Sequence, residues 1–293
     1  MKLAFIAQND LDGIAADAQF AAEQGFAGLE FNYWAGFAEL TTETVLAMRK
    51  ILDQHGVRAA SLGLWGWNHT SPDAEEQRTS LGHLDRAIEF AELLGAEILI
   101  TGGGNVPGSS LDENAAAFTE VFAPYLEKAQ NAGLQVALYA VHGNSFFDSI
   151  AAYQKVWETM PNVGIKFDPA NIMHHGDDYL PWLRDHGDHI YHVHIKEHLY
   201  MDGELVSQPA AGMGDVQWGK VMAFLYEHNY QGYLCFEPHG PLWSKPPLRH
   251  KMLLLTKKYL SQFTAELTLR RARHVVPYAR STVESCLWLG GVV

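Results

Sequence analysis

The sequence predicts a single α/β domain with the (β/α)8 architecture of a TIM barrel. Eight short apolar segments recur along the 293 residues, and stretches with helical periodicity separate them. Strands that are almost continuously apolar and alternate with helices are typical of a parallel sheet covered by helices. The eight units fill about 260 residues, which matches the usual size of such a barrel.

The predicted strands follow one another at the spacing of strand–helix units. In chain order they cover residues 2–7, 28–31, 57–64, 97–101, 135–141, 163–168, 190–195 and 233–237. Between the third and fourth strands, apolar residues recur at three- and four-residue steps, as on a helix with one buried face: Leu84, Ala87, Ile88, Ala91 and Leu94. A doubly wound open sheet is the alternative, but no G-x-G-x-x-G motif follows the first strand.

Helix boundary signals agree with this order of elements. Ser71, followed by Pro72 and Asp73, predicts an N-cap with proline at the first helical position. Residues 110–113, Ser-Leu-Asp-Glu, predict a capping box. Four glycines are expected to end a helix shortly before the next strand: Gly25, Gly56, Gly95 and Gly133.

We assign residues 1–263 to the barrel and residues 264–293 to a C-terminal extension or an appended tail that is foreign to the barrel. This last segment carries an arginine cluster at residues 270–273 and a strongly apolar end. The alternative interpretation gives this segment a function, as a helix and tail that pack on a partner subunit. It contains no pattern that points to chemistry.

Composition limits the possible partners and compartment. The chain is 47% apolar and 19% charged, as in ordinary globular proteins, and no segment reaches transmembrane length. Its formal net charge of −13 argues against nucleic-acid and anionic membrane partners. The two cysteines, Cys235 and Cys286, provide no disulfide framework, so a cytoplasmic location is expected.

Polar residues end the sixth, seventh and eighth predicted strands. Catalytic groups of such barrels lie at the carboxyl ends of the strands, and alternate strand residues share one face. Asp168, His194 and Glu237 are therefore expected together at the inner mouth. Two carboxylates and one imidazole suit a divalent cation such as Mn²⁺, Zn²⁺, Co²⁺ or Mg²⁺.

The chain also resembles the xylose isomerase-like barrel family of sugar phosphate isomerases and epimerases. The likeness extends from residue 1 to about residue 263, and five segments carry it: LGAEILITGGG (94–104), DPAN (168–171), HVHIKE (192–197), GMGDVQW (212–218) and GYLCFEPHG (232–240). It implies a divalent metal, with Mn²⁺ preferred, bound by Asp168, His194 and Glu237. It also implies a small sugar or sugar derivative as ligand and a homodimer or homotetramer.

The fifth strand departs from the family pattern. The family has a metal-binding Glu at the end of this strand, where Tyr139 stands here, and His142 lies one residue beyond the place of the family histidine. Family isomerases and epimerases use two carboxylates on opposite faces of the substrate. The expected catalytic set is therefore Glu237 as metal ligand and base, with His142 or Tyr139 as proton partner.

Further residues near the strand ends are expected to contact a carbohydrate. Aromatic rings at a barrel mouth stack well on sugar rings, although a hydrophobic rim or subunit contact is the alternative. Structural ion pairs are the alternative for Glu30 and Lys196; otherwise Lys196 would polarise a carbonyl or bind an anionic group. The complete set is Glu30, Trp65, Trp67, His69, Asn171, Lys196 and His239.

The function expected from these features is that of a metal-dependent sugar, sugar phosphate or keto-sugar isomerase or epimerase. It would abstract a proton and stabilise an enediolate. A keto-sugar lyase or dehydratase is the first alternative, because elimination needs one base and one acid rather than two matched bases. A non-catalytic barrel that serves as a subunit or sugar-binding partner is the second. The acidic charge argues against the DNA-repair nucleases that share this barrel.

Overall fold

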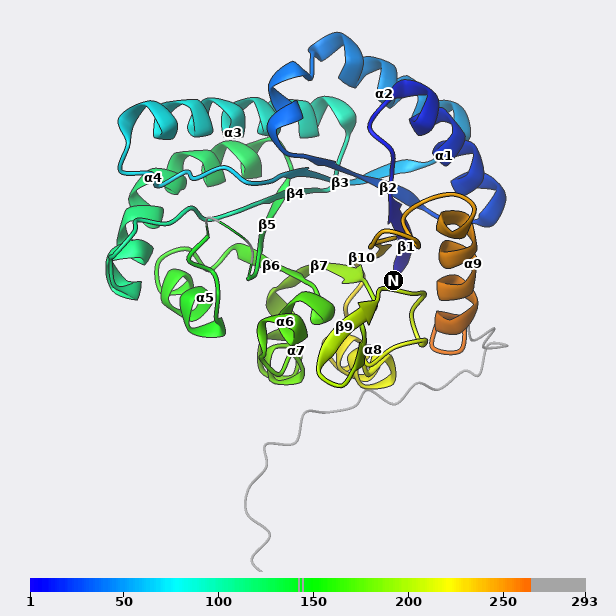
Figure 1. Ribbon diagram of the computed structural model, residues 1–293. Helices are drawn as coiled ribbons and strands as arrows, with labels where there is room; N and C mark the ends of the chain where they lie inside the picture. The colour runs from blue at the N-terminus through cyan, green and yellow to red at the C-terminus, as the bar shows by residue number, and fades with distance from the viewer. Residues whose placement is uncertain (142, 144, 265–293) are drawn as a thin grey trace, which may run out of the picture.

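The computed structural model describes residues 1–264 except residues 142 and 144. These residues form a closed barrel of eight parallel strands, which confirms the predicted (β/α)8 fold (Figure 1). Around the ring the strands are β1 (Lys2–Ile6), β10 (Tyr233–Phe236), β7 (Ile190–Ile195), β6 (Val163–Phe167), β5 (Gln135–Tyr139), β4 (Ile98–Thr101), β3 (Arg58–Leu64) and β2 (Gly28–Tyr33). Their bounds lie within two residues of those predicted.

Helices form the outer layer around the strands (Figure 1). They are α1 (Leu11–Gln24), α2 (Thr42–His55), α3 (Ala74–Leu94), α4 (Leu111–Asn131), α5 (Ile150–Trp157), α6 (Pro169–His175), α7 (Leu180–His186), α8 (Trp218–Glu227) and α9 (Leu248–Leu260), with short 3₁₀ turns at Ala35–Glu39 and Gly187–His189. Among the described residues, no helix is both long and apolar enough to cross a membrane.

Most predicted helix boundaries are confirmed. Ser110 and Glu113 form the capping box at the start of α4, and the residues that cap the ends of α1, α2 and α3 are left-handed glycines. The predicted start of α3 is wrong, because its N-cap is Asp73 rather than Ser71. The Asp73 carboxylate accepts two backbone N–H groups of the first turn, and Ser71 instead donates to Glu76.

The two faces of the strands pack differently. Successive strand residues point to opposite faces, so Phe5 packs outward against Phe20 of α1 while Ala4 points into the barrel. Ala4, Ala60 and Cys235 belong to a small cluster inside the barrel. Small side chains there leave room for large polar ones closer to the mouth.

Two strand pairs change register beside these polar side chains. Glu30 of β2 pairs with Ser61 of β3 after a one-residue shift. Lys166 of β6 pairs with His192 of β7 after another. Such bulges redirect side chains and are frequent beside active sites. They bring polar residues of neighbouring strands to one level of the barrel interior.

A hairpin that was not predicted from the sequence follows β7. Its strands β8 (Leu199–Met201) and β9 (Glu204–Ser207) pair antiparallel outside the barrel ring. Glu197 anchors this region, because its carboxylate accepts the backbone N–H groups of Gly212 and Val216 and the indole N–H of Trp218. The GMGDVQW segment is therefore attached to the end of β7 through Glu197.

A buried ion pair attaches α9 to α1. The guanidinium of Arg249 donates to both carboxylate oxygens of Asp17, at 2.7 and 2.8 Å, and to the carbonyl oxygen of Ile6 at 2.9 Å. The two side chains are 10% and 1% exposed. This pair holds the last helix against the first strand–helix unit (Figure 1).

We expect Arg249→Met to lower the free energy of unfolding by about 3–5 kcal/mol, because the carboxylate of Asp17 is left buried without its partner. Urea unfolding measures the change. Arg184→Met is the matched control, since the ion pair of Arg184 with Asp185 is exposed on α7 and should contribute no resolvable stability. Equal losses in the two variants would contradict the structural importance of the buried pair.

Candidate active site at the barrel mouth

A cavity of about 430 Å³ opens at the carboxyl ends of the strands. Its lining comes mainly from the ends of β1, β2, β3, β6, β7 and β10 and from the loops that follow them. Six residues that the sequence predicted for the site line it: Trp65, Asn171, His194, Lys196, Glu237 and His239. A cavity of this size accommodates a small polyhydroxylated molecule.

Asp168, His194 and Glu237 converge at this cavity, where His194 and Glu237 line it and Asp168 lies beside them. Their ligand atoms all lie within 4.8 Å of one another. Nδ1 of His194 is 2.6 Å from Oε2 of Glu237 and 3.8 Å from Oδ2 of Asp168. Two carboxylates and an imidazole nitrogen suit a divalent cation, so these residues could hold one with positions left open for substrate.

Asp168 is placed by the transition from β6 to α6. It is the N-cap of α6, where its Oδ1 accepts the backbone N–H of Asn171 at 3.0 Å. Its Oδ2 accepts from Nζ of Lys166 at 2.9 Å. Burial would raise the pKa of Asp168, but the charges of Lys166 and Lys196 hold it below its usual value. The carboxylate is therefore ionised at neutral pH.

Glu237 follows β10 and points into the cavity. Its Oε1 lies 3.3 Å from Nζ of Lys196 and 2.9 Å from Nδ1 of His239. Burial would raise the pKa of Glu237, yet Lys196 and hydrogen bonds from His194 and His239 keep it well below its usual value. Glu237 is thus an ionised carboxylate that lines the cavity, as a general base must be.

Lys196 lies beside this carboxylate and stays charged. Burial would lower its pKa, but Glu237 and Asp168 raise it above its usual value. Its Nζ donates to Oδ1 of Asn171 at 2.9 Å. An ammonium held in this way can donate to a substrate oxygen but is a poor nucleophile.

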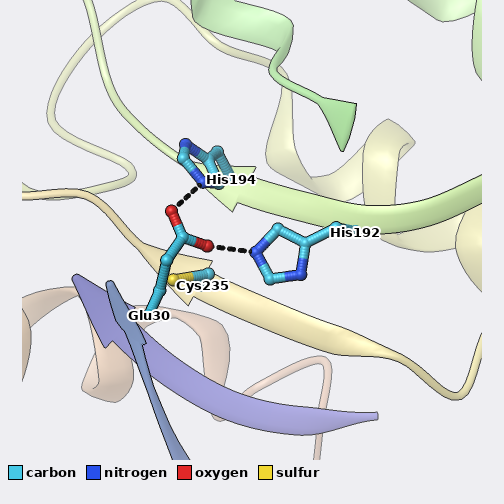
Figure 2. A group of neighbouring side chains, drawn as sticks. All are labelled: Glu30, His192, His194 and Cys235. Carbon is cyan, nitrogen blue, oxygen red and sulfur yellow. Dashed lines mark hydrogen bonds and ion pairs between the residues drawn. The ribbon is translucent and has the colours of Figure 1, made fainter. Parts of the chain in front are cut away.

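Glu30 lies below the cavity floor between two histidines of β7 (Figure 2). Its Oε1 is 2.8 Å from Nε2 of His194, and its Oε2 lies in an ion-pair contact 2.5 Å from Nε2 of His192. Burial would raise the pKa of Glu30, but His194 and His192 hold it well below its usual value. Glu30 is fully buried and does not line the cavity, so its position does not match the predicted substrate contact.

Stacked aromatic rings form one wall of the cavity. The ring of Trp65 lies 5.6 Å from that of Trp34 and 4.4 Å from that of Tyr139, nearly parallel to both. Trp34 and Trp65 line the cavity, whereas Tyr139 lies behind Trp65. Burial raises the pKa of Tyr139 to about 12. The geometry therefore gives no support to Tyr139 as the proton partner.

Three other predicted residues do not join this cluster. The ring nitrogens of His69 lie 2.8 Å from Oγ1 of Thr101 and 2.7 Å from Oγ of Ser80, and burial lowers the pKa of His69 to about 3. Trp67 packs on His83 away from the cavity lining. His142 lies outside the described residues, and its role stays a prediction.

Two cavity histidines were not among the predicted site residues: His198 lies in the loop after β7, and His174 lies near the end of α6. His198 is 2% exposed, and burial lowers its pKa to about 4, so it is neutral at physiological pH. His174 points to the hairpin, with Nδ1 2.7 Å from the hydroxyl of Tyr200. The sequence signal for His198 was the second histidine of the segment HIKEH (194–198). The alternation that predicts which side chains face the interior stops at the end of the strand, so it gave no direction for His198.

We expect metal affinity to fall in acid because His194 must lose a proton before Nδ1 can bind a cation. Burial lowers the pKa of His194, but the carboxylates of Glu30 and Glu237 raise it above its ordinary value of 6.5. Below that raised pKa, affinity should fall about tenfold per pH unit. Co²⁺ titrations between about pH 5 and pH 8 test this; affinity that is independent of pH would contradict it.

Three known proteins show what this chain is similar to. Inosose dehydratase from Clostridium perfringens is 21% identical over 249 residues, which cover 75% of this chain and 82% of that protein. D-allulose 3-epimerase from Methylomonas sp. has a TM-score of 0.70 at 19% identity, over 90% of this chain and 96% of that one. The IOLI protein with a binding zinc atom has a TM-score of 0.72 at 14% identity, over 90% and 98% of the two chains. At these identities the two structural matches establish the fold.

A family profile gives the wider relationship. The profile described as xylose isomerase-like TIM barrel matches residues 18–258, from within α1 to within α9. The matched segment contains Asp168, His194 and Glu237 together with the strands that carry them. The chain belongs to the xylose isomerase-like TIM barrel family.

Proposed function

We propose that this protein is an enzyme that removes a proton from the carbon beside the carbonyl of a sugar or a related polyhydroxylated ketone. The observation that carries the proposal is the convergence of Asp168, His194 and Glu237 at a cavity with an aromatic wall. Glu237 is ionised there and is the proposed base. Trp34, which is 53% exposed and packs on Trp65, offers an apolar surface on which a sugar ring would stack.

The cofactor proposed for the cluster is one divalent cation, with Mn²⁺ preferred over Zn²⁺, Co²⁺ and Mg²⁺. Asp168, Glu237 and Nδ1 of His194 would hold it, and it would supply Lewis-acid stabilisation of negative charge on substrate oxygens. Lys196 donates to the oxygen that gains charge as the proton leaves. Asn171 orients Lys196 through the hydrogen bond to its Nζ.

The first candidate reaction is isomerisation or epimerisation, in which the proton returns to the substrate. Glu237 is the one carboxylate among the described residues that line the cavity, alongside three histidines besides the proposed metal ligand His194, namely His174, His198 and His239. A histidine would therefore return the proton from the second face. The likeness in fold to D-allulose 3-epimerase is compatible with this reaction.

The second candidate is dehydration of the same class of substrate. The single carboxylate in the described lining favours it, since elimination needs one base and one acid that protonates the departing hydroxyl. Lys196 or a cavity histidine would be that acid. The sequence likeness to inosose dehydratase supports this candidate.

Proton exchange with solvent tests the proposal. Protein loaded with Mn²⁺ is incubated in deuterated water with a panel of ketoses and cyclic keto-polyols, and deuterium incorporation is followed by NMR. We expect exchange beside the carbonyl of at least one compound, slowed about 10²–10⁴-fold by Glu237→Gln because the base is lost. A new epimer or isomer would identify the first reaction, and loss of water the second.

The matched control is Glu204→Gln, which changes the same functional group on the exposed strand β9. It should exchange deuterium at the wild-type rate. Exchange that survives unchanged in Glu237→Gln would remove Glu237 as the base. Absence of exchange across the whole panel in metal-loaded protein would contradict this class of substrate.

A further inference from the structure

The two ring nitrogens of His194 face different carboxylates. Nδ1 points to the mouth, 2.6 Å from Oε2 of Glu237, while Nε2 points to the barrel interior, 2.8 Å from Oε1 of Glu30 (Figure 2). A neutral imidazole that binds a cation through one nitrogen carries its proton on the other. A buried N–H without an acceptor is costly. Whatever accepts the Nε2 proton therefore decides which nitrogen is available at the mouth.

Glu30 is itself held in place by fixed donors. Oε1 also accepts from Nδ2 of Asn32 at 2.7 Å, and Oε2 accepts from the hydroxyl of Ser61 at 2.7 Å. The amide oxygen of Asn32 is in turn bonded to the indole N–H of Trp65 at 2.7 Å, so the amide cannot flip without losing both contacts. The carboxylate is thus presented to His194 in one orientation.

The chain of contacts also runs from the aromatic wall to the floor of the cavity. Trp65 lines the cavity and donates a hydrogen bond to Asn32, and Asn32 donates one to Glu30. Glu30 in turn is hydrogen-bonded to His194. Position 63 must be glycine beside this series of hydrogen bonds, since a Cβ at Gly63 would lie 2.1 Å from Oδ1 of Asn32. The backbone of β3 is therefore shaped around the hydrogen bond that orients Asn32.

We propose that Glu30 is the positioning residue of the metal centre: it binds Nε2–H of His194 and thereby turns Nδ1 toward Asp168 and Glu237. A carboxylate behind a ligating histidine orients the ring, and its loss typically weakens metal binding 10- to 100-fold. The inference rests on the metal centre of the proposed function. It replaces the substrate contact expected for Glu30, whose side chain is fully buried.

A rival arrangement places the cation on the inner side of His194. Glu30, His192, His194 and Cys235 also have ligand atoms within 4.8 Å of one another, and both nitrogens of His192 lack hydrogen bonds. The cavity lining favours the outer cluster, because His194 and Glu237 both line the cavity, whereas of the four inner residues only His194 does. A cation on the inner side would therefore be out of reach of a substrate in the cavity.

Cobalt titration of the metal-free protein separates these arrangements. We expect Glu30→Gln to bind Co²⁺ about 10- to 100-fold more weakly than wild type. Glu204→Gln is the matched control, because it makes the same substitution at an exposed residue of β9 outside this hydrogen-bond network. It should bind Co²⁺ nearly as tightly as wild type. Circular dichroism and thermal unfolding of the metal-free variants confirm that each is folded.

A spectroscopic readout follows the contact itself. In ¹⁵N-labelled wild-type protein, Nε2–H of His194 should give a slowly exchanging signal with and without Co²⁺ or diamagnetic Zn²⁺, assigned by its loss in His194→Gln. Folded Glu30→Gln should lose this protection. Should Glu30→Gln fail to fold, Asn32→Ala replaces it, because it removes the donor that anchors Oε1; weaker cobalt binding is again expected.

Three outcomes would overturn the inference. Equal cobalt affinity in wild type and a folded Glu30→Gln or Asn32→Ala variant would overturn the positioning role alone. A sulfur-to-cobalt charge-transfer band that Cys235→Ser removes would place the ion on the inner side of His194. Absence of any cobalt uptake by wild type would instead overturn the proposed metal centre, and the positioning role with it.

Discussion

Mutual compensation of buried charges at the barrel mouth is the constraint on which the rest of this structure depends. Burying a charge without a partner lowers the stability of the fold by roughly several kcal/mol. Each buried charge must therefore have a partner at short range. Three carboxylates lie against two ammonium groups and one hydrogen-bonded imidazole here: Glu30, Asp168, Glu237, Lys166, Lys196 and His194. The pairs keep the carboxylates ionised at neutral pH, which is the state that binding a cation and accepting a proton both require.

The strands and loops are arranged to hold these pairs. The register shifts on β3 and β7 bring Ser61 opposite Glu30 and His192 opposite Lys166. Asp168 satisfies the start of α6 with one oxygen and Lys166 with the other. Each polar group therefore serves both the fold and the candidate site, and backbone hydrogen bonds contribute to the precision of the side chains.

The fifth strand shows how a change of one residue type alters the chemistry available. Tyr139 stands at the strand end where the family pattern has a carboxylate, and it pairs with Lys166 across the sheet. Its ring supports Trp65, and the ammonium of Lys166 lies 5.4 Å from the ring of Trp65. An aromatic stack thus replaces a second carboxylate on this side of the mouth. In the proposed isomerisation a histidine would return the proton from that side, and in the proposed dehydration no such return is needed.

The sequence by itself determined the barrel, its strand bounds and the approach of Asp168, His194 and Glu237, because alternation along each strand is a local property. It did not determine what supports them. Glu30 and His194 are 164 residues apart in the chain, and only closure of the barrel makes them partners. Tertiary contacts likewise decided that His69 contacts the buried hydroxyls of Thr101 and Ser80. They also decided that the region of the hairpin is anchored on Glu197. Local patterns show which residues face the interior, whereas the partners of an interior residue depend on strands that meet only when the ring closes.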